Sequence, residues 1–327
     1  MTTRLALFVN PMSGRDVRRI AARASNVTHE SKMDTIARLA VGADQVGVDE
    51  LYIFQEPFRI ATQALEWVDL KAKVRTLNLK LHHDASDTEQ AMCRLRAEGV
   101  DTVVALGGDG THRIIARCAP EITLIPLSTG TNNVFPVHIE PTVAGMAAAL
   151  AAQGLLSGCE TEVSRPCKVL HLEFQDGTKD IALIDAVVLG DDFIGNFLPY
   201  ESQKIKEMVL TCALPDSVGM SPIGGFVEVV EKSDDFGLYL RLGQGHKWNA
   251  PVSPGYFQPV SATAASRVKL DQSLYLNGPG VVAMDGDREH RLHELERVKV
   301  TLRRDGPTVL DVPTALRHAV AHNMLVS

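Results

Sequence analysis

The stretch Thr102-Val-Val-Ala-Leu-Gly-Gly-Asp-Gly-Thr111 decides the fold class of this chain. Its first five residues form a continuous apolar run, which is typical of a strand buried on both faces of a parallel sheet. Glycines and one carboxylate follow at once, and the residues around Ile114 then predict a short helix. In open α/β sheets, ligands bind where a strand ends and the next helix begins. The stretch therefore predicts a parallel α/β sheet with a ligand site directly after this strand.

The segment Gly107-Gly108-Asp109-Gly110-Thr111 has a composition that suits the binding of phosphate groups. Glycine has no Cβ, so the backbone can approach phosphate oxygens closely, and the N-terminus of the following helix offers unpaired N–H groups. The carboxylate of Asp109 could orient a magnesium ion that bridges phosphates, or it could accept the proton of an attacking hydroxyl group. The sequence leaves both roles open. Because an isolated match of this length is often only a tight turn, the rest of the chain has to decide.

Strands and helices alternate on both sides of this segment, which predicts an α/β first domain over residues 1–157. The helices are indicated by an arginine-rich stretch after residue 14, by the capping box Ser86-Asp-Thr-Glu89 that opens a helix to Gly99, and by an alanine-rich run at residues 143–153. The expected strands are residues 5–9, 51–54, 74–81, 102–106 and 122–127.

The second half of the sequence predicts a mainly β domain over residues 158–308, because short apolar runs are separated by turn residues such as Asp176-Gly177. An antiparallel sandwich or layered sheet fits this pattern best. Residues 309–327 contain an amphipathic helix at 313–324, which we expect to pack back on one of the domains. The expected strands are residues 169–174, 181–189, 237–242, 267–270, 274–276, 281–284 and 297–302.

The composition limits the number of domains and the classes of partner that the chain can have. With 327 residues, 45% apolar and 22% charged side chains, the chain is long enough for two folded domains. A formal net charge of −7 argues against nucleic acid as a partner, so an anionic nucleotide would have to be bound locally by backbone N–H groups and a metal ion. The five cysteines are scattered, and no apolar run approaches the 18 or so residues of a membrane helix. We therefore expect a cytoplasmic protein with no membrane partner.

The Gly-Gly-Asp-Gly-Thr segment after an apolar strand resembles the signature of the NAD kinase and diacylglycerol kinase superfamily. Asn10-Pro-Met-Ser-Gly14 is similar to the loop that lies against the nucleotide phosphates in the lipid-kinase branch, and Thr129-Gly-Thr-Asn-Asn133 resembles the family loop that contacts the nucleotide. Within the superfamily, the Gly-Thr-Asn-Asn and Gly-Met-Ser patterns are similar to the acetoin-catabolism (AcoX) group. The nucleotide-binding residues that the resemblance implies are Asn10, Ser13, Gly14, Gly107, Gly108, Gly110, Thr111, Thr129, Gly130, Thr131, Asn132 and Asn133.

Two further segments complete the resemblance. Gly219-Met-Ser-Pro-Ile-Gly-Gly225 is similar to a Ser- and Gly-rich segment of NAD kinases, and Met284-Asp-Gly-Asp287 resembles the Asp-Gly element of their β domain. The implied architecture has an N-terminal α/β domain, a C-terminal β domain and an active site in the cleft between them. On the substrate side of that cleft, the candidates are Asp185, Asp285 and Gly286.

The sequence departs from NAD kinases on the acceptor side. Their Asn-Glu pair corresponds to Leu183-Ile-Asp-Ala186 here, and their Gly-Ser-Thr-Ala-Tyr stretch corresponds to Pro215-Asp-Ser-Val-Gly219. Because a site that pairs with a substrate group discriminates through that pairing, the acceptor could be NAD or a related hydroxylated metabolite.

The resemblance implies an enzyme that transfers a phosphoryl group to an alcohol, with ATP and Mg²⁺ as cofactors and Asp109 as base or metal organiser. Two alternatives stay open: a nucleotide-binding regulator without catalysis, and a lipid-type kinase, although no basic amphipathic stretch for a membrane surface is visible. NADP biosynthesis and acetoin catabolism are the roles that this resemblance suggests. Assembly into a homo-oligomer is also left open.

Overall fold

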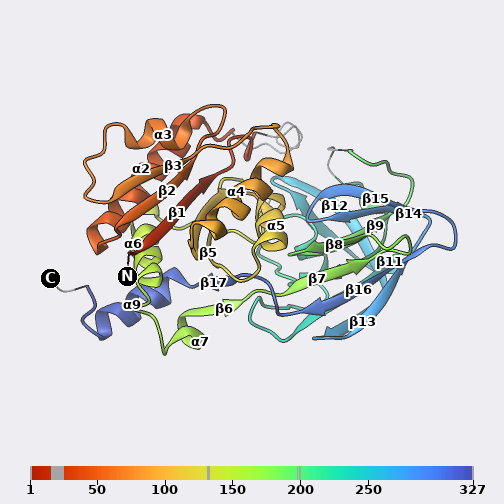
Figure 1. The fold of residues 1–327 in the computed structure, drawn as a ribbon. Coiled ribbons are helices and arrows are strands. Elements are labelled where there is room, and N and C mark those ends of the chain that lie inside the picture. The colour runs from red at the N-terminus through yellow and green to blue at the C-terminus, as the bar shows by residue number, and fades with distance from the viewer. Residues whose placement is uncertain (1, 16–25, 131–132, 197, 199, 326–327) are drawn as a thin grey trace.

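A seven-stranded sheet forms the first domain, in the strand order β3-β2-β1-β4-β5-β17-β6. This computed structural model describes residues 2–15, 26–130, 133–196, 198 and 200–325, and Figure 1 shows them as two domains that lie next to each other. The arginine-rich stretch at residues 16–25 and the candidate site residues Thr131 and Asn132 fall outside the described residues.

The first six strands of the sheet order are parallel to one another, as the apolar runs predicted, and the seventh, β6, is antiparallel to β17. Residues 102–107 are buried throughout, which confirms the central strand from which the fold was inferred. Because β1 has β2 on one side and β4 on the other, the strand order reverses between β1 and β4, where ligands bind in such sheets. The five N-terminal strands are β1 (Arg4–Val9), β2 (Glu50–Phe54), β3 (Lys73–Leu77), β4 (Thr102–Gly107) and β5 (Thr123–Ser128).

Helices cover both faces of this sheet. One face packs against α2 (His29–Val46), α3 (Ile60–Leu65), α6 (Pro141–Ala152) and α9 (Val312–Ala321), and the other packs against α4 (Ala85–Ala97) and α5 (Asp109–Cys118). The C-terminal helix α9 therefore packs on the first domain.

One helix prediction needs correction, and one helix was missed. The capping box at Ser86 is shifted, because Asp84 is the N-cap and its Oδ1 accepts from the Ser86 N–H at 2.8 Å. The 18-residue helix α2 was not predicted at all. Its buried face includes Lys32 and Gly42, which do not resemble an apolar stripe in the sequence.

The second domain is a sandwich of two antiparallel sheets, which confirms the prediction of a mainly β domain. The six-stranded sheet has the order β12-β11-β10-β9-β14-β15 and the four-stranded sheet has the order β13-β16-β7-β8. Val188 and Val282 from the first sheet pack against Leu170 and Val300 from the second. The strands are β7 (Val169–Glu173), β8 (Lys179–Ala182), β9 (Asp185–Leu189), β10 (Ile205–Leu210), β11 (Phe236–Ser253), β12 (Tyr256–Lys269), β13 (Ser273–Asn277), β14 (Gly280–Met284), β15 (Asp287–Leu292) and β16 (Arg297–Arg303), with a short 3₁₀ helix η1 (Ser202–Lys204) and helix α8 (Ser221–Gly225).

Three strand predictions in this domain were wrong in extent. The run 181–189 is two strands, β8 and β9, that belong to different sheets. The runs 237–242 and 267–270 are parts of β11 and β12, a long hairpin of 18 and 14 residues. The middle of this hairpin was not predicted from the sequence because Gly243, Gly245 and Pro259 interrupt the strand pattern.

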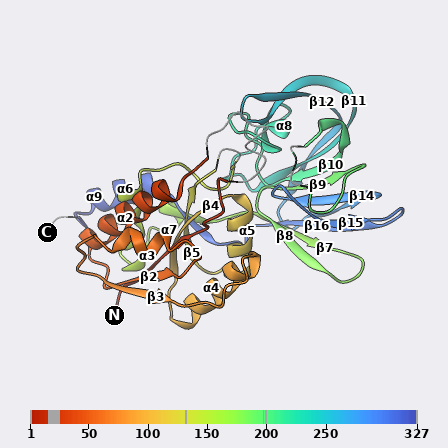
Figure 2. The ribbon, with the colours of Figure 1, turned by 90° about the horizontal axis from the view of Figure 1, so that it is seen from above.

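The chain crosses between the domains at residues 167–168 and again at 304–307. Strand β6 (Ser164–Pro166), which follows the boundary expected at residue 157, still pairs in the first sheet, and so does β17 (Thr308–Leu310). A four-residue helix, α7 (Glu160–Val163), precedes β6. Figure 2 shows α5 at the edge of the first domain that faces the β sandwich.

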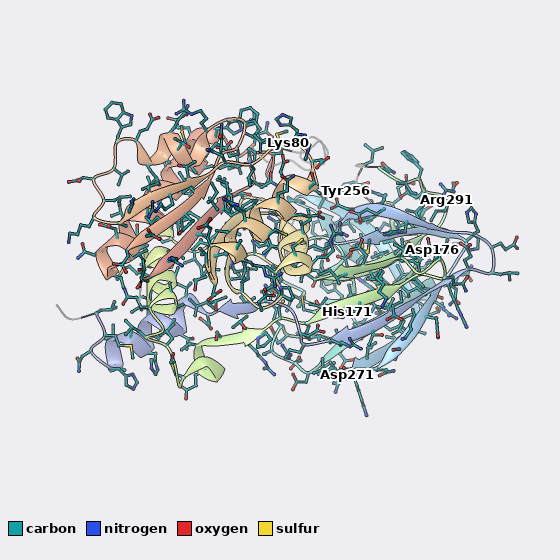
Figure 3. The ribbon with its side chains drawn as sticks, in the orientation of Figure 1. Lys80, His171, Asp176, Tyr256, Asp271 and Arg291 are labelled. Carbon is teal, nitrogen blue, oxygen red and sulfur yellow. The ribbon has the colours of Figure 1, made fainter. Side chains whose placement is uncertain are left out.

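Side chains cover the outside of both domains in Figure 3, with Lys80 on the first domain and Asp176, Arg291 and Asp271 on the second. Within the part of the chain that the structure describes, no helix is both long and apolar enough to cross a membrane.

Candidate functional site

Three loops meet at the carboxyl ends of β1, β4 and β5, and side chains tie them together. Asn10, after β1, donates from Nδ2 to Oγ1 of Thr111 at 2.8 Å, which links the first loop to the segment after β4. Thr129, after β5, donates from its hydroxyl to Oγ of Ser13 at 2.7 Å, which links the third loop back to the first. The three motifs that the sequence singled out are therefore one connected structure.

The Asn10–Gly14 loop is a tight turn held by its own side chains. Oδ1 of Asn10 accepts from the N–H groups of Met12 and Ser13, and the Ser13 hydroxyl donates to the Asn10 carbonyl at 2.8 Å. Gly14 has a φ of +72°, and a Cβ there would lie 2.2 Å from the carbonyl oxygen of Thr129. Only glycine fits both requirements, so the contact between the loops depends on it.

The Gly107–Thr111 segment is not the free glycine loop that the sequence suggested. Gly107 ends β4, Gly108 is the N-cap, and Asp109, Gly110 and Thr111 form the first turn of α5. The first N–H groups of a helix have no partner within the helix and carry its positive dipole end. The segment therefore still provides a place for an anion, and the helix itself provides it.

The carboxylate of Asp109 is fixed by the third loop. Its oxygens accept from the Phe135 N–H at 2.9 Å and from the Val134 N–H at 3.1 Å. Burial, and then the nearby charge of Asp285, raise the pKa of Asp109 to about 7 against the effect of these two N–H groups. A carboxyl group with a pKa near neutrality is suited to proton transfer at physiological pH.

Asp285 organises the second-domain side. Its φ of +49° lies in the left-handed region. Its carboxylate accepts from the N–H groups of Leu183, Ile184 and Asp185 at 2.8, 2.7 and 3.1 Å. These bonds replace strand pairing at Leu183 and Ile184, which is why the predicted strand 181–189 breaks there. Burial raises the pKa of Asp285 to about 6, although Arg113 and the three N–H groups act in the opposite direction.

Asp185 is the least satisfied polar side chain of the site. It is 7% exposed, and among the described residues its Oδ1 has no hydrogen-bond partner. Burial, followed by the charges of Asp285 and Asp109, raises its pKa well above the ordinary value. A buried carboxyl oxygen without a partner is costly, so this oxygen is suited to accept a hydrogen bond from a molecule in the cavity.

A cavity of about 780 Å³ joins these elements and lies between the two domains. Gly107 and Thr129 do not line the cavity but lie behind the residues that do. The second-domain side adds apolar side chains, among them Tyr200, Met220 and Val252, that the sequence did not single out. Of the predicted site residues that the structure describes, those that line the cavity are Asn10, Ser13, Gly14, Gly108, Asp109, Gly110, Thr111, Gly130, Asn133, Asp185, Asp285 and Gly286.

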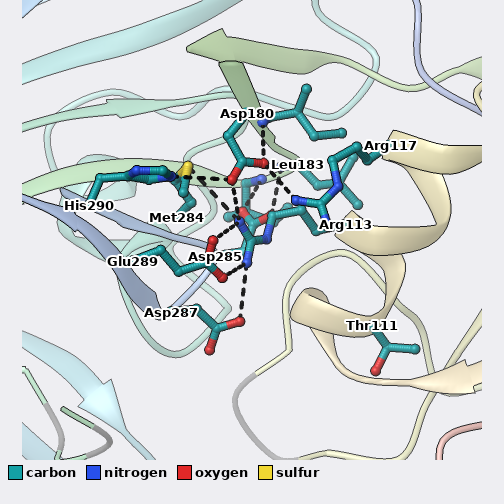
Figure 4. A network of polar contacts seen from close by, with 12 residues as sticks. Thr111, Arg113, Arg117, Asp180, Leu183, Met284, Asp285, Asp287, Glu289 and His290 are labelled. Atoms are coloured by element: carbon teal, nitrogen blue, oxygen red, sulfur yellow. Dashed lines mark hydrogen bonds and ion pairs between the residues drawn. The ribbon is translucent and has the colours of Figure 1, made fainter. Parts of the chain in front are cut away.

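Sequence reasoning missed an arginine that connects α5 to the second domain. Arg113 is 2% exposed, and Figure 4 shows it reaching from α5 toward Asp287 and Glu289 of β15. Its Nη2 lies 3.4 Å from Asp287 Oδ2 and also pairs with Glu289, and its Nη1 lies 3.7 Å from Asp180 of β8. Only its charge was visible in the sequence, because its partners are far away along the chain.

A second cluster of acidic residues belongs to the same ion-pair network around Arg113. Oxygens of Asp180 and Glu289 and a ring nitrogen of His290 lie close enough together to hold a metal ion. Burial favours the neutral form of Asp180, but the hydrogen bond with His290 and the charges of Arg113 and Arg117 lower its pKa to about 2. Two guanidinium groups already balance this cluster, so it connects the domains through ion pairs.

Lys32 and His112 are two further residues that the sequence did not single out. Lys32 of α2 is 1% exposed, and its Nζ donates to the carbonyl oxygens of Asn10, Pro11 and Ser13 at 2.8–2.9 Å. His112 is fully buried, and its Nδ1 lies 2.8 Å from the carbonyl oxygen of Gly108. Burial lowers the pKa of His112 to about 4. These residues brace the first and second loops from behind.

Comparisons with known proteins agree with the two-domain fold. Residues 11–155 match the ATP-NAD kinase N-terminal domain family, and residues 168–305 match the acetoin catabolism protein X C-terminal domain family. The chain is 29% identical to acetoin catabolism protein X of Cupriavidus necator, in an alignment that covers 99% of this chain and 94% of that protein. The change from one family to the other falls where the chain passes from the first sheet to the second domain.

Proposed function

Because this chain belongs to the NAD kinase-like superfamily, with an acetoin catabolism protein X type of C-terminal domain, we propose that it is an ATP-dependent small-molecule kinase. It would transfer a phosphoryl group to a hydroxyl of NAD or a related metabolite. The observation that carries the proposal is the position of Asp109. This carboxyl stands at the first turn of α5, lines the cavity between the domains and has a pKa near 7.

The nucleotide phosphates are proposed to lie on the first-domain side of the cavity. Three kinds of group there suit them: the first-turn N–H groups of α5, the Asn10–Gly14 turn, and the side chain of Asn133. The hydrogen bonds Asn10–Thr111 and Thr129–Ser13 would keep these groups in place before ATP arrives. Such preorganisation lowers the cost of fixing the phosphates for transfer.

Phosphoryl transfer is proposed to proceed in line. The acceptor oxygen forms a bond to the γ-phosphorus of ATP while the bond between that phosphorus and the β–γ bridging oxygen breaks, so ADP leaves. Asp109 accepts the proton of the acceptor hydroxyl. Its raised pKa favours this role over that of a permanently charged carboxylate.

Magnesium fits the oxygen-rich side of this cavity. Asp287 is the carboxylate that would hold it, because a Cβ on Gly110 would lie 2.8 Å from Asp287 Oδ2, which places that carboxylate over the first turn of α5. Mg²⁺ prefers one or two carboxylates together with phosphate oxygens and water. When bound, the ion would neutralise charge on the phosphates and on Asp287.

A nucleotide-binding regulator without catalysis is the second candidate. It is favoured by the acceptor side, where Leu183 and Ile184 use their N–H groups to bind Asp285, and the Asn-Glu pair of NAD kinases is absent. The name of the Cupriavidus necator relative refers to acetoin catabolism, and either function could operate beside that pathway.

The deciding experiment is product analysis after incubation of the protein with magnesium-ATP, NAD and a panel of hydroxylated metabolites. The kinase proposal expects a phosphorylated acceptor from the wild-type protein and none above background from Asp109→Asn. The matched control is Asp271→Asn, since Asp271 is exposed and its φ of +61° suits asparagine. Nucleotide binding without any product from the full panel would contradict the kinase and support the regulator.

A further inference from the structure

Phe135, which binds the carboxylate of Asp109, is held on three sides. Its N–H donates to Oδ1 of Asp109 at 2.9 Å, and its ring lies against His112, with ring centroids 5.6 Å apart. Its carbonyl oxygen accepts from Nζ of Lys232 at 3.0 Å. The first two contacts come from α5 of the first domain, whereas Lys232 belongs to the second domain. The proposed base is therefore connected, through one residue, to a lysine of the other domain.

Lys232 lies in the segment of residues 231–236, which is attached to both chain crossings between the domains. At the first crossing, Nζ of Lys168 donates to the carbonyls at the two ends of this segment, at 2.9 and 2.8 Å. At the second crossing, the guanidinium of Arg304 donates to three carbonyls between them, at 2.6–3.4 Å. The backbone of Lys232 is therefore fixed, and only its exposed side chain has to be ordered to reach Phe135.

The charge of Lys232 also acts on the proposed base. It favours the ionised carboxylate, whereas Asp285 and Asp185 on the second-domain side favour the protonated form. Two further ionisable groups nearby are neutral at physiological pH, because burial raises the pKa of Cys212 and lowers that of His112. Lys232 therefore opposes the two acids electrostatically, in addition to its contact with the loop.

Building on the proposed kinase function, we infer that Lys232 is a positioning residue for phosphoryl transfer, which holds Phe135 and, through it, the carboxylate of Asp109 in the geometry for proton transfer. Lys232 does not line the cavity, so it acts without touching a substrate there. Because it belongs to the second domain, the base is held in place only while the two domains keep their relative position.

The test uses Lys232→Met, which removes the donor and the charge, and Lys232→Arg, which keeps both. Lys247→Met is the matched control, since Lys247 is an exposed lysine of β11. Steady-state kinetics are measured at pH 6 and pH 8 with magnesium-ATP, NAD and the panel of hydroxylated metabolites. Independently of turnover, the titration of the Asp109 carboxyl is followed by carbon NMR, with its signal assigned through Asp109→Asn.

Lys232→Met should lower kcat by about tenfold at pH 6, the effect of one lost hydrogen bond. The KM for ATP should stay unchanged, because Lys232 does not line the cavity. Loss of the positive charge favours the protonated carboxyl, so the pKa of Asp109 should rise and the loss of kcat should be smaller at pH 8. Lys232→Arg should restore both the rate and the titration, and Lys247→Met should change neither.

An unchanged titration of Asp109 in a folded Lys232→Met protein would overturn the inference. Equal effects of the Met and Arg variants would overturn it as well, and so would a raised KM for ATP with an unchanged kcat. If the wild-type protein transfers no phosphoryl group to any acceptor, the proposed kinase function fails. The NMR titration then still decides whether Lys232 controls the carboxyl of Asp109.

Discussion

The ammonium group of Lys32 lies 2.9 Å from the carbonyl oxygen of Asn10, behind the loop that faces the cavity. The same group reaches the carbonyls of Pro11 and Ser13, so one side chain of α2 sets the path of the whole turn. With its carbonyls directed back toward α2, this turn is fixed beside the proposed phosphate site.

Replacing this lysine should weaken nucleotide binding without unfolding the protein. Lys32→Met keeps most of the buried stem but leaves three carbonyls without their donor, so we expect a dissociation constant for magnesium-ATP about tenfold higher, which corresponds to one or two lost hydrogen bonds. Titration calorimetry measures this, with the exposed Lys71→Met as the matched control. An unchanged ATP affinity in a folded Lys32→Met protein would show that the turn does not touch the nucleotide.

Asp109→Asn should separate catalysis from binding. The asparagine Oδ1 can still accept from the Phe135 N–H, so the loop should hold its position. The side chain can no longer accept a proton, and we expect phosphoryl transfer to fall by about 10²–10⁴-fold, the usual contribution of a positioned general base. Single-turnover kinetics and ATP binding should be measured together. A similar loss of binding and rate would instead indicate a structural role.

The buried carboxyl groups should make stability fall as pH rises. Asp109 and Asp285 have pKa values raised to about 7 and about 6, and the pKa of Asp185 is also raised, so these groups bind protons more tightly in the folded state than in the unfolded state. Folding therefore favours the protonated forms of these groups. Their contribution to the free energy of unfolding is lost as pH rises from about 4 through about 7.

Asp185→Asn should therefore stabilise the protein at pH 8, by about 1–3 kcal/mol, because it replaces a buried charge with a neutral side chain and each unit of pKa shift corresponds to about 1.4 kcal/mol. The gain should shrink toward pH 5, because a raised pKa leaves more of the native carboxyl protonated as the pH falls. Thermal unfolding at the two pH values, with Asp271→Asn for comparison, checks this. Destabilisation by Asp185→Asn at both pH values would contradict the expectation.

Loss of Arg113 should destabilise the protein more than any other change proposed here. Arg113→Met would leave Asp180, Asp287 and Glu289 together without their shared partner, and breaking such a buried network costs about 3–5 kcal/mol. Denaturant unfolding measures the loss. Arg113→Lys keeps the charge and should recover part of the stability, whereas the exposed Arg38→Met should cost little. Equal stabilities of the Met and Lys variants would show that the charge is unimportant.

The sequence predicted the parts of the fold that depend on neighbouring residues. The apolar run 102–106 followed by glycines was sufficient to predict β4 and α5, because strand, turn and helix signals are all local. The loops at Asn10 and Thr129 were also found, and the order of parallel strands brings their ends together.

What escaped prediction depends on residues far apart in the sequence. Lysine and arginine on a predicted helix are ordinarily exposed, so the sequence does not show that Lys32 and Arg113 are buried. The loop at residues 10–13 buries Lys32, and strand β15 buries Arg113. The split of 181–189 has the same origin, since Asp285 supplies its hydrogen bonds from about a hundred residues away. Periodicity cannot reveal a partner of this kind.

The two crossings between the domains determine when the protein can fold during its synthesis. Strand β17 pairs with β5 on one side and β6 on the other, so the first sheet receives an inner strand only after the β sandwich has been translated. A nascent chain ending near residue 160 would therefore expose an edge of β5 that is covered in the finished protein. The sandwich is in effect an insertion in the first domain, and joining residue 166 to residue 307 through a short linker should yield that domain as a separate folding unit.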